Sequence, residues 1–197
     1  MIPRRNILLI GLPLALGACG LSERPYAERR QWPLLVPRPT TLPPRAGAAV
    51  LEIRELRAGP GLDARGLQSV QPDGSIRTAF YEEWTVPPAR GVEDALRGWL
   101  GASGQFSGVV NAGSRAVATL AIEGELTALW VNLAAKTAHA AIAVVVIDLR
   151  AGGRRIISQI TMRATASVTD PTEANQVQAQ LVALADVFGQ IERVVSR

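Results

Sequence analysis

The chain has 197 residues with 21 basic and 17 acidic side chains, a net charge of +4, one cysteine and one histidine. Charges of both signs alternate along it, and the clustered Lys/Arg and interleaved aromatic residues of a nucleic-acid interface are absent, so we predict no nucleic-acid partner. A lone cysteine offers neither an internal disulfide nor a cysteine metal cluster. The length suits one domain with a sizeable core.

The first 18 residues have the layout of a bacterial export signal. Two arginines precede an apolar segment over 7–16, and small residues follow it. This segment is shorter than the ~20 residues of a transmembrane helix. The sequence Leu-Gly-Ala-Cys that ends at Cys19 matches the lipobox of bacterial lipoproteins. We therefore predict cleavage between Ala18 and Cys19, acylation of Cys19, and attachment to a membrane through its lipid.

The residues after the cysteine predict the membrane to which the lipoprotein is sorted, and a spacer. Gly20 stands where an aspartate usually retains lipoproteins in the inner membrane of Gram-negative cells, so we expect the periplasmic face of the outer membrane. Six prolines between Gly20 and Gly47 favour an extended, semi-rigid spacer. We therefore divide the chain into a signal (1–18), a lipid-anchored tether (19–47) and a folded domain (48–197). Whether 32–36 adds a short edge strand stays open at this point.

The first part of the domain alternates in the manner of β-strands. Strands are predicted over 48–56 and 76–86, with a short one near 106–110. On the second of these strands, four apolar side chains share one parity and are expected to face the core: Ile76, Phe80, Trp84 and Val86. Apolar residues at helical spacing between Val92 and Leu100 then predict an amphipathic helix that ends at Gly101.

The second part reads as an antiparallel meander followed by a helix. Strands are predicted from Arg115, over 138–149 and over 154–168, with a tight turn at Gly152-Gly153 between the last two. On the last strand, apolar positions from Ile156 to Val168 are expected to point inward. Asp-Pro-Thr-Glu at 170–173 predicts a helix start capped by Asp170. We expect an α+β domain with a mostly antiparallel sheet and two amphipathic helices packed on one face.

No residue set with catalytic or metal-binding spacing is found, and we predict no enzyme activity, cofactor or metal. His139 lies in the most apolar strand, which suits a structural histidine. Glu123 and Glu125 share a strand face, as an acid/base pair could, but a solvated polar face explains them equally well. Trp130 lies where its strand loses alternation, so we single it out as a candidate partner-binding residue on an exposed apolar edge.

Several diffuse motifs occur in a recognisable order. A lipobox and a proline-rich tether precede Leu62-Asp63-x-Arg65, and Tyr81-x-x-Trp84-x-x-Pro87-Pro88 then leads into an amphipathic helix. With a last helix after a long β-hairpin, this order resembles the ABC-type transport auxiliary lipoproteins, the Pqi-type lipoproteins that accompany MCE-domain lipid transport systems.

The resemblance implies a non-enzymatic outer-membrane lipoprotein. It would dock onto an MCE-domain protein of a lipid ABC transporter that moves phospholipids across the periplasm, with homo-oligomerisation as an open possibility. Two alternatives remain: a structural or assembly lipoprotein of another envelope export machine, and a lipoprotein enzyme. The resemblance assigns a role to Cys19 alone.

Overall fold

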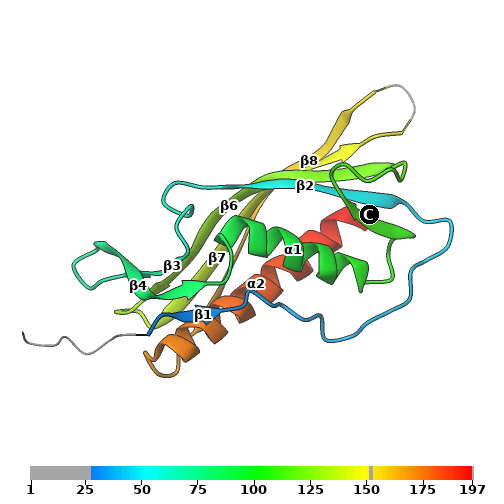
Figure 1. Cartoon of the computed structure of the whole chain (residues 1–197). Helices are drawn as coiled ribbons and strands as arrows, with labels where there is room; N and C mark the ends of the chain where they lie inside the picture. The colour runs from blue at the N-terminus through cyan, green and yellow to red at the C-terminus, as the bar shows by residue number, and fades with distance from the viewer. Residues whose placement is uncertain (1–27, 151–152, 197) are drawn as a thin grey trace, which may run out of the picture.

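The computed structural model describes residues 28–150 and 153–196, so the predicted export signal, Cys19 and part of the tether lie outside it. The described residues form one sheet with helices on one of its faces (Figure 1). In chain order the elements are β1 (Arg30–Trp32), β2 (Val50–Ala58), β3 (Gly66–Val70), β4 (Ile76–Trp84), α1 (Pro88–Gly101), β5 (Gly108–Asn111), β6 (Leu120–Asn132), β7 (Thr137–Asp148), β8 (Arg155–Ser167) and α2 (Glu173–Val195).

Strand β6 organises the sheet. One side of β6 pairs along its whole length with β7, which in turn pairs with β8, and both pairings are antiparallel. The other side pairs with two strands placed end to end, β2 beside Leu120–Leu126 and β3 beside Val131–Asn132, both parallel to β6. β5 pairs in parallel with the other side of β2. β4 pairs antiparallel with the other side of β3, and β1 pairs in parallel with β4. The predicted α+β class and the antiparallel meander are confirmed, and the sheet as a whole is mixed.

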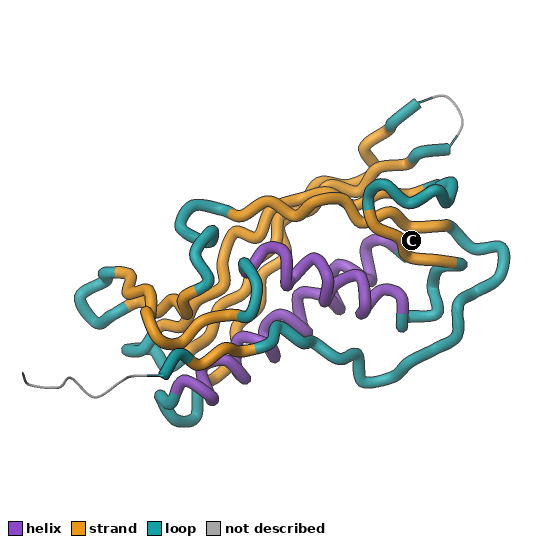
Figure 2. Tube along the Cα trace, viewed as in Figure 1, coloured by secondary structure: helices purple, strands orange, loops and turns teal. Residues whose placement is uncertain are grey.

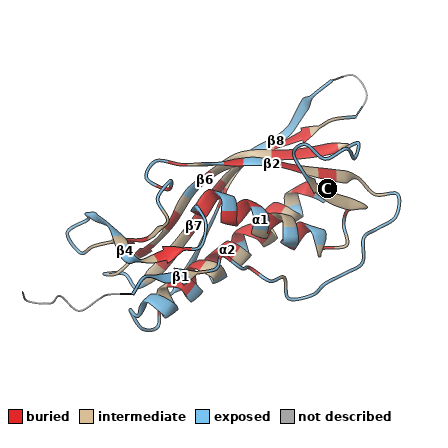
Figure 3. Ribbon diagram, in the orientation of Figure 1, coloured by how far each residue is buried: buried red, intermediate tan, exposed pale blue. Residues whose placement is uncertain are grey.

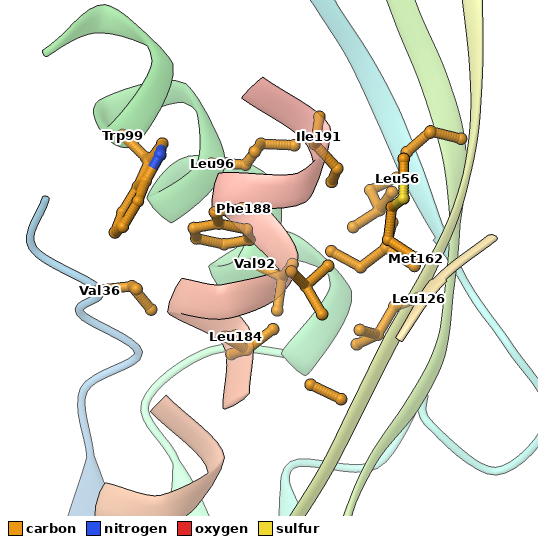
Figure 4. Close-up of a cluster of buried hydrophobic side chains, with 14 of the residues drawn as sticks. Val36, Leu56, Val92, Leu96, Trp99, Leu126, Met162, Leu184, Phe188 and Ile191 are labelled. Atoms are coloured by element: carbon orange, nitrogen blue, oxygen red, sulfur yellow. The ribbon is translucent and has the colours of Figure 1, made fainter. Parts of the chain in front are cut away.

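The two helices cover the same face of the sheet, as predicted. Helix α1 packs on β2, β5 and β6, and α2 packs on β6, β7 and β8. Pro88 takes the first helical position of α1, where its fixed φ and missing N–H cost nothing. Trp84 and Trp99, both predicted in the core, are 1% and 7% exposed. Figure 4 shows Phe188 of α2 between Trp99 and the sheet residues Leu56 and Leu126.

The start of α2 lies slightly later than the sequence signal placed it. Thr172, and not Asp170, is the N-cap, and its hydroxyl accepts a hydrogen bond from the backbone N–H of Asn175 at 3.4 Å. Glu173 is thus the first helical residue, where its negative charge still favours the positive end of the helix dipole. The turn predicted at Gly152-Gly153 lies partly outside the described residues, but the strands that it joins are paired as expected.

The predicted tether boundary at Gly47 is wrong, because residues 30–47 pack along the domain. Strand β1 pairs in parallel with the end of β4, and Leu34 and Val36 are buried in the core. We call residues 33–49 the strap. It runs as a loop past the helices to the far end of the sheet (Figure 2). A Cβ added to Gly91 of α1 would lie 3.0 Å from the Leu34 side chain, so the strap and the helix are in close contact there.

The strap is also held by its backbone. The N–H of Leu42 donates to the carbonyl of Ala102 at 2.9 Å, and the N–H of Arg45 donates to the carbonyl of Phe106 at 3.0 Å. The strap prolines lack N–H groups and are tolerated because few of its positions need a donor. Proline density therefore indicated an extended backbone correctly, but not a free one.

We expect Leu34→Ala to destabilise the domain by about 2–4 kcal/mol, because it removes a buried side chain that is packed against α1. The matched control is Leu35→Ala, whose side chain is 68% exposed and whose effect should stay within about 0.5 kcal/mol. Urea unfolding followed by circular dichroism measures both. Equal stabilities for the two variants would restore the free-tether interpretation of this segment.

The expected apolar faces of two strands are only half buried. On β4, Trp84 is buried, but Ile76 and Phe80 are each 67% exposed. On β8, Met162 is buried under α2, whereas Ile156, Ile157 and Ile160 are exposed. Simple alternation fails on both strands, because the register of β4 shifts between Thr78 and Glu83 and that of β8 between Ile156 and Ser158, so that Ile76 and Ile156 do not share a face with Trp84 and Met162.

Candidate docking surfaces

The motif residues that carried the resemblance form an internal joint. Arg65 donates from Nη2 to Oε1 of Glu83 at 2.9 Å, and the backbone N–H of Trp84 donates to the carbonyl of Arg65 at 2.8 Å. Gln31 of β1 donates to the same carboxylate oxygen of Glu83 at 3.0 Å. These contacts tie the β2–β3 connection to β4 and β1. The contacts of Arg65 and Trp84 in this motif are therefore structural.

A second joint closes the strap against the helices. The carboxylate of Glu192 on α2 accepts two hydrogen bonds from Arg38, at 3.0 and 3.2 Å, and one from Nε1 of Trp99 at 2.7 Å. Arg38 and Glu192 are both largely buried. A groove of about 750 Å³ lies beside them between the strap, α2 and β8. Because the ion pair that borders it is satisfied internally, the groove offers no free charge from Glu192 or Arg38.

Glu93 forms a third joint that sequence reasoning missed. Its carboxylate is 4% exposed, accepts the backbone N–H of Leu56 at 3.0 Å, and pairs with Arg90 at 3.0 Å. The pairing of β2 with β6 is irregular between Ile53 and Leu56, which frees that N–H from the strand ladder. The carboxylate of Glu93, on α1, takes the place of the missing strand partner as acceptor for this N–H. Nothing in the sequence indicates a bulge at this position.

The carboxylate pair Glu123 and Glu125 faces away from the helices and is held by arginines. Arg54 donates to Glu123 and to Glu52, each at 3.1 Å, and Arg57 lies 3.4 Å from Glu125. Burial alone would lower the pKa of Arg54, but these hydrogen bonds outweigh it and raise that pKa. The arrangement fits a polar sheet face with compensated charges, which was the alternative to an acid/base pair.

Trp130 and His139 meet on the same uncovered face. They are cross-strand neighbours on β6 and β7, and their rings stack with centroids 4.0 Å apart. Burial lowers the pKa of His139, and Thr137 lies within hydrogen-bond distance of its Nε2. The predicted exposed edge at 129–131 is wrong, because β6 is internal to the sheet and Leu129 and Val131 are buried. Trp130 itself is half-buried, and its partner-binding role stays a prediction.

The described residues contain neither a metal-binding cluster nor a membrane-spanning helix. Among residues 28–150 and 153–196, no three His, Cys, Asp or Glu side chains gather as a metal cluster. In the same part of the chain, neither helix combines the length and apolarity that crossing a membrane requires.

Several of the exposed large apolar side chains belong to two groups, on β8 and on β4, and parts of both strands are coloured as exposed in Figure 3. One group, the β8 patch, consists of Ile156, Ile157 and Ile160 on the unpaired edge of the sheet. The other, the hairpin patch, consists of Ile76, Phe80 and Tyr81 on β4. Strand register places the first group beside the start of β6 and the second beside its end. Thirteen residues of β6 at about 3.3 Å each separate the two ends by about 40 Å.

The fold is shared with several solved structures, which defines the class of domain. An uncharacterised protein matches with a TM-score of 0.66 and 14% identity over 85% of this chain and 99% of that one. Protein XCC0632 from Xanthomonas campestris matches with a TM-score of 0.61 and 15% identity, covering 77% and 88% of the two chains. The hypothetical protein CT253 from Chlamydia trachomatis matches with a TM-score of 0.55 and 12% identity, covering 76% and 96%.

The sequence match is more specific than the fold. The family of ABC-type transport auxiliary lipoprotein components matches residues 34–192, and the chain belongs to this family. A search of curated proteins gave no match. The chain is thus an auxiliary lipoprotein of an ABC-type transport system, and its domain, by the family match as by the packing, begins before Gly47.

Proposed function

We propose that this lipoprotein is a non-enzymatic docking component of an MCE-type ABC system that moves phospholipids across the periplasm. It is anchored to the periplasmic face of the outer membrane through acylated Cys19. The observation that carries the proposal is the family match over 34–192, which spans nearly all of the packed domain, including the strap from Leu34 onward. The carboxylates that we inspected as catalytic candidates are engaged in structural ion pairs, which supports a binding role.

The β8 patch is the surface that we assign to the MCE-domain partner. β8 has one unpaired edge thirteen residues long, and such an edge offers backbone donors and acceptors to another chain. The exposed isoleucines add apolar area at that edge. The three isoleucines lie near the end of this edge that is beside the start of β6, away from β1, where the predicted anchored N-terminal segment enters. A partner that approaches from the periplasm meets this end first.

We expect a photo-crosslinking amino acid at Ile157, in cells, to capture an MCE-domain protein. The matched control is Val182, an equally apolar and 45% exposed position on α2 that lies outside the β8 patch. A third probe at Trp130 tests the uncovered sheet face. Because the patch is apolar, we expect capture from Ile157 to change little with salt.

Two outcomes would contradict the proposal. If the probe at Ile157 captured only a component of another envelope export machine, the protein would be assigned to that machine instead. Equal capture of the MCE-domain protein from Ile157 and Val182 would leave the proposed function standing but would remove its assignment to β8.

A further inference from the structure

The hairpin of β3 and β4 exposes an unusual concentration of large apolar side chains. Ile76 and Phe80 are 67% exposed and Tyr81 is 46% exposed, and the rings of Phe80 and Tyr81 meet edge to face with centroids 5.0 Å apart. The hairpin projects past the helices at one end of the molecule (Figure 1). Phe80 and Tyr81 line a pocket together with Glu173 and Gln176 at the start of α2, yet both rings remain exposed.

The described chain begins at this patch. The guanidinium carbon of Arg29 lies 4.7 Å from the centroid of the Phe80 ring, and β1 follows directly beside the end of β4. Arg29 is the tenth residue after Cys19. Fully extended, ten residues span at most about 35 Å, and any less extended path is shorter. A lipid on Cys19 therefore keeps Arg29, and the hairpin beside it, within about 35 Å of the bilayer surface.

We propose that the hairpin patch inserts into the phospholipid bilayer and forms a second membrane contact beside the lipid anchor. This inference rests on the acylation of Cys19 that is part of the proposed function. The patch has the composition of a membrane-interface contact, because Tyr and Phe suit the boundary between headgroups and acyl chains and flanking arginines can extend to the headgroups. It differs from a partner-docking surface in that the protein's own anchor brings the bilayer to it.

The charges around the patch are nearly balanced, which makes the contact mainly apolar. Three arginines and four carboxylates flank it: Arg29, Arg30, Arg77, Glu28, Asp73, Glu82 and, from the start of α2, Glu173. Glu82 is already engaged by Nε1 of Trp32 at 2.7 Å, and Asp73 by Ser75. Binding should therefore depend on buried apolar area and respond weakly to salt, unlike adsorption of a polybasic segment to anionic lipid.

Two contacts at one end fix the orientation of the domain. With the lipid and the hairpin both at the membrane, β6 points away from the bilayer. The β8 patch then faces the periplasm about 40 Å from the hairpin. An anchor alone would leave the domain free to turn.

The test uses the full-length acylated protein in vesicles of phosphatidylethanolamine and phosphatidylglycerol. In a Phe80→Cys variant, an environment-sensitive fluorophore is attached to the new cysteine. This is the only free thiol, because Cys19 is the only native cysteine and its thiol is acylated. Val117→Cys is the matched control, since Val117 is 85% exposed and apolar but lies just before β6, at the far end. We expect a blue-shifted emission and strong quenching by nitroxide-labelled lipids at position 80, and neither at position 117, at low and high salt alike.

The outcomes separate the inference from its premise. If the acylated protein fails to float with the vesicles, the anchor itself is wrong. If it floats but the label at position 80 has the same emission wavelength and the same quenching by nitroxide-labelled lipids as the label at position 117, the anchor prediction stands and the hairpin contact is overturned. Protection of position 80 only after a partner protein is added would also overturn it, because a protein would then cover the patch. Circular dichroism of both labelled variants checks that each is folded.

Discussion

We expect the replacement of Cys19 with serine to abolish acylation and to release the protein from the membrane fraction. Two acyl chains at about 0.8 kcal/mol for each buried methylene hold a protein firmly, whereas the hairpin patch alone offers only a few exposed side chains. Incorporation of radiolabelled palmitate and membrane fractionation are the measurements. The expected result is loss of label and appearance of the domain in the soluble fraction.

The matched control is Gly20→Asp, which keeps the cysteine and therefore the lipid. It should remain in membranes but move from the outer to the inner membrane if Gly20 sets the address. The anchor prediction is contradicted if the Cys19→Ser protein, shown by mass to have lost its signal, fractionates with membranes as wild type does. An uncleaved signal has to be excluded because the apolar segment 7–16 can retain a precursor at the membrane.

Phe188→Ala is expected to cost about 3–5 kcal/mol, a large part of the 5–15 kcal/mol that stabilises a typical domain. Phe188 is fully buried and packs edge to face on Trp99, with ring centroids 5.8 Å apart. It lies where α1, α2 and the sheet meet (Figure 4), so the cavity cannot close by moving one element alone.

The control for this variant is Val182→Ala on the same helix, whose side chain is 45% exposed and whose loss should stay within about 0.5 kcal/mol. Urea midpoints at constant m-value measure both. Similar midpoints for the two variants would show that the core does not depend on the contact between the helices, and the packing described above would need revision.

Local periodicity was enough to predict most of the secondary structure. The meander of β6, β7 and β8 and the stripe of α2 are long and regular, so their alternation identified them, and Trp84 and Trp99 were placed in the core correctly. What periodicity could not give was the position of irregularities in strand pairing. Phe80 has the same parity as Trp84 and is nevertheless exposed, and it lies within the register shift of β4 between Thr78 and Glu83, which the sequence does not reveal.

The joints between distant segments could not be predicted for a related reason. Arg38 and Glu192 are 154 residues apart in sequence, and neither differs in local context from a solvated surface charge. The role of Glu93 on α1 depends on a bulge in a different element. The strap was misjudged because its prolines suggest a spacer, while the alternation of Leu34 and Val36 is too short to outweigh them.

The path of the strap determines how the protein bears mechanical load. A pull on a lipidated N-terminus reaches the domain first at β1, which has three residues and pairs with one neighbour, β4. Behind it, seventeen residues of strap are held by Leu34, Val36 and the Arg38–Glu192 pair before β2 begins. Peeled from the domain, the strap would add roughly 60 Å of reach at full extension, with the loss of the core contacts of Leu34 and Val36. Under tension on the anchor, β1 and then the strap would therefore detach and lengthen the link to the membrane before any force reaches β6.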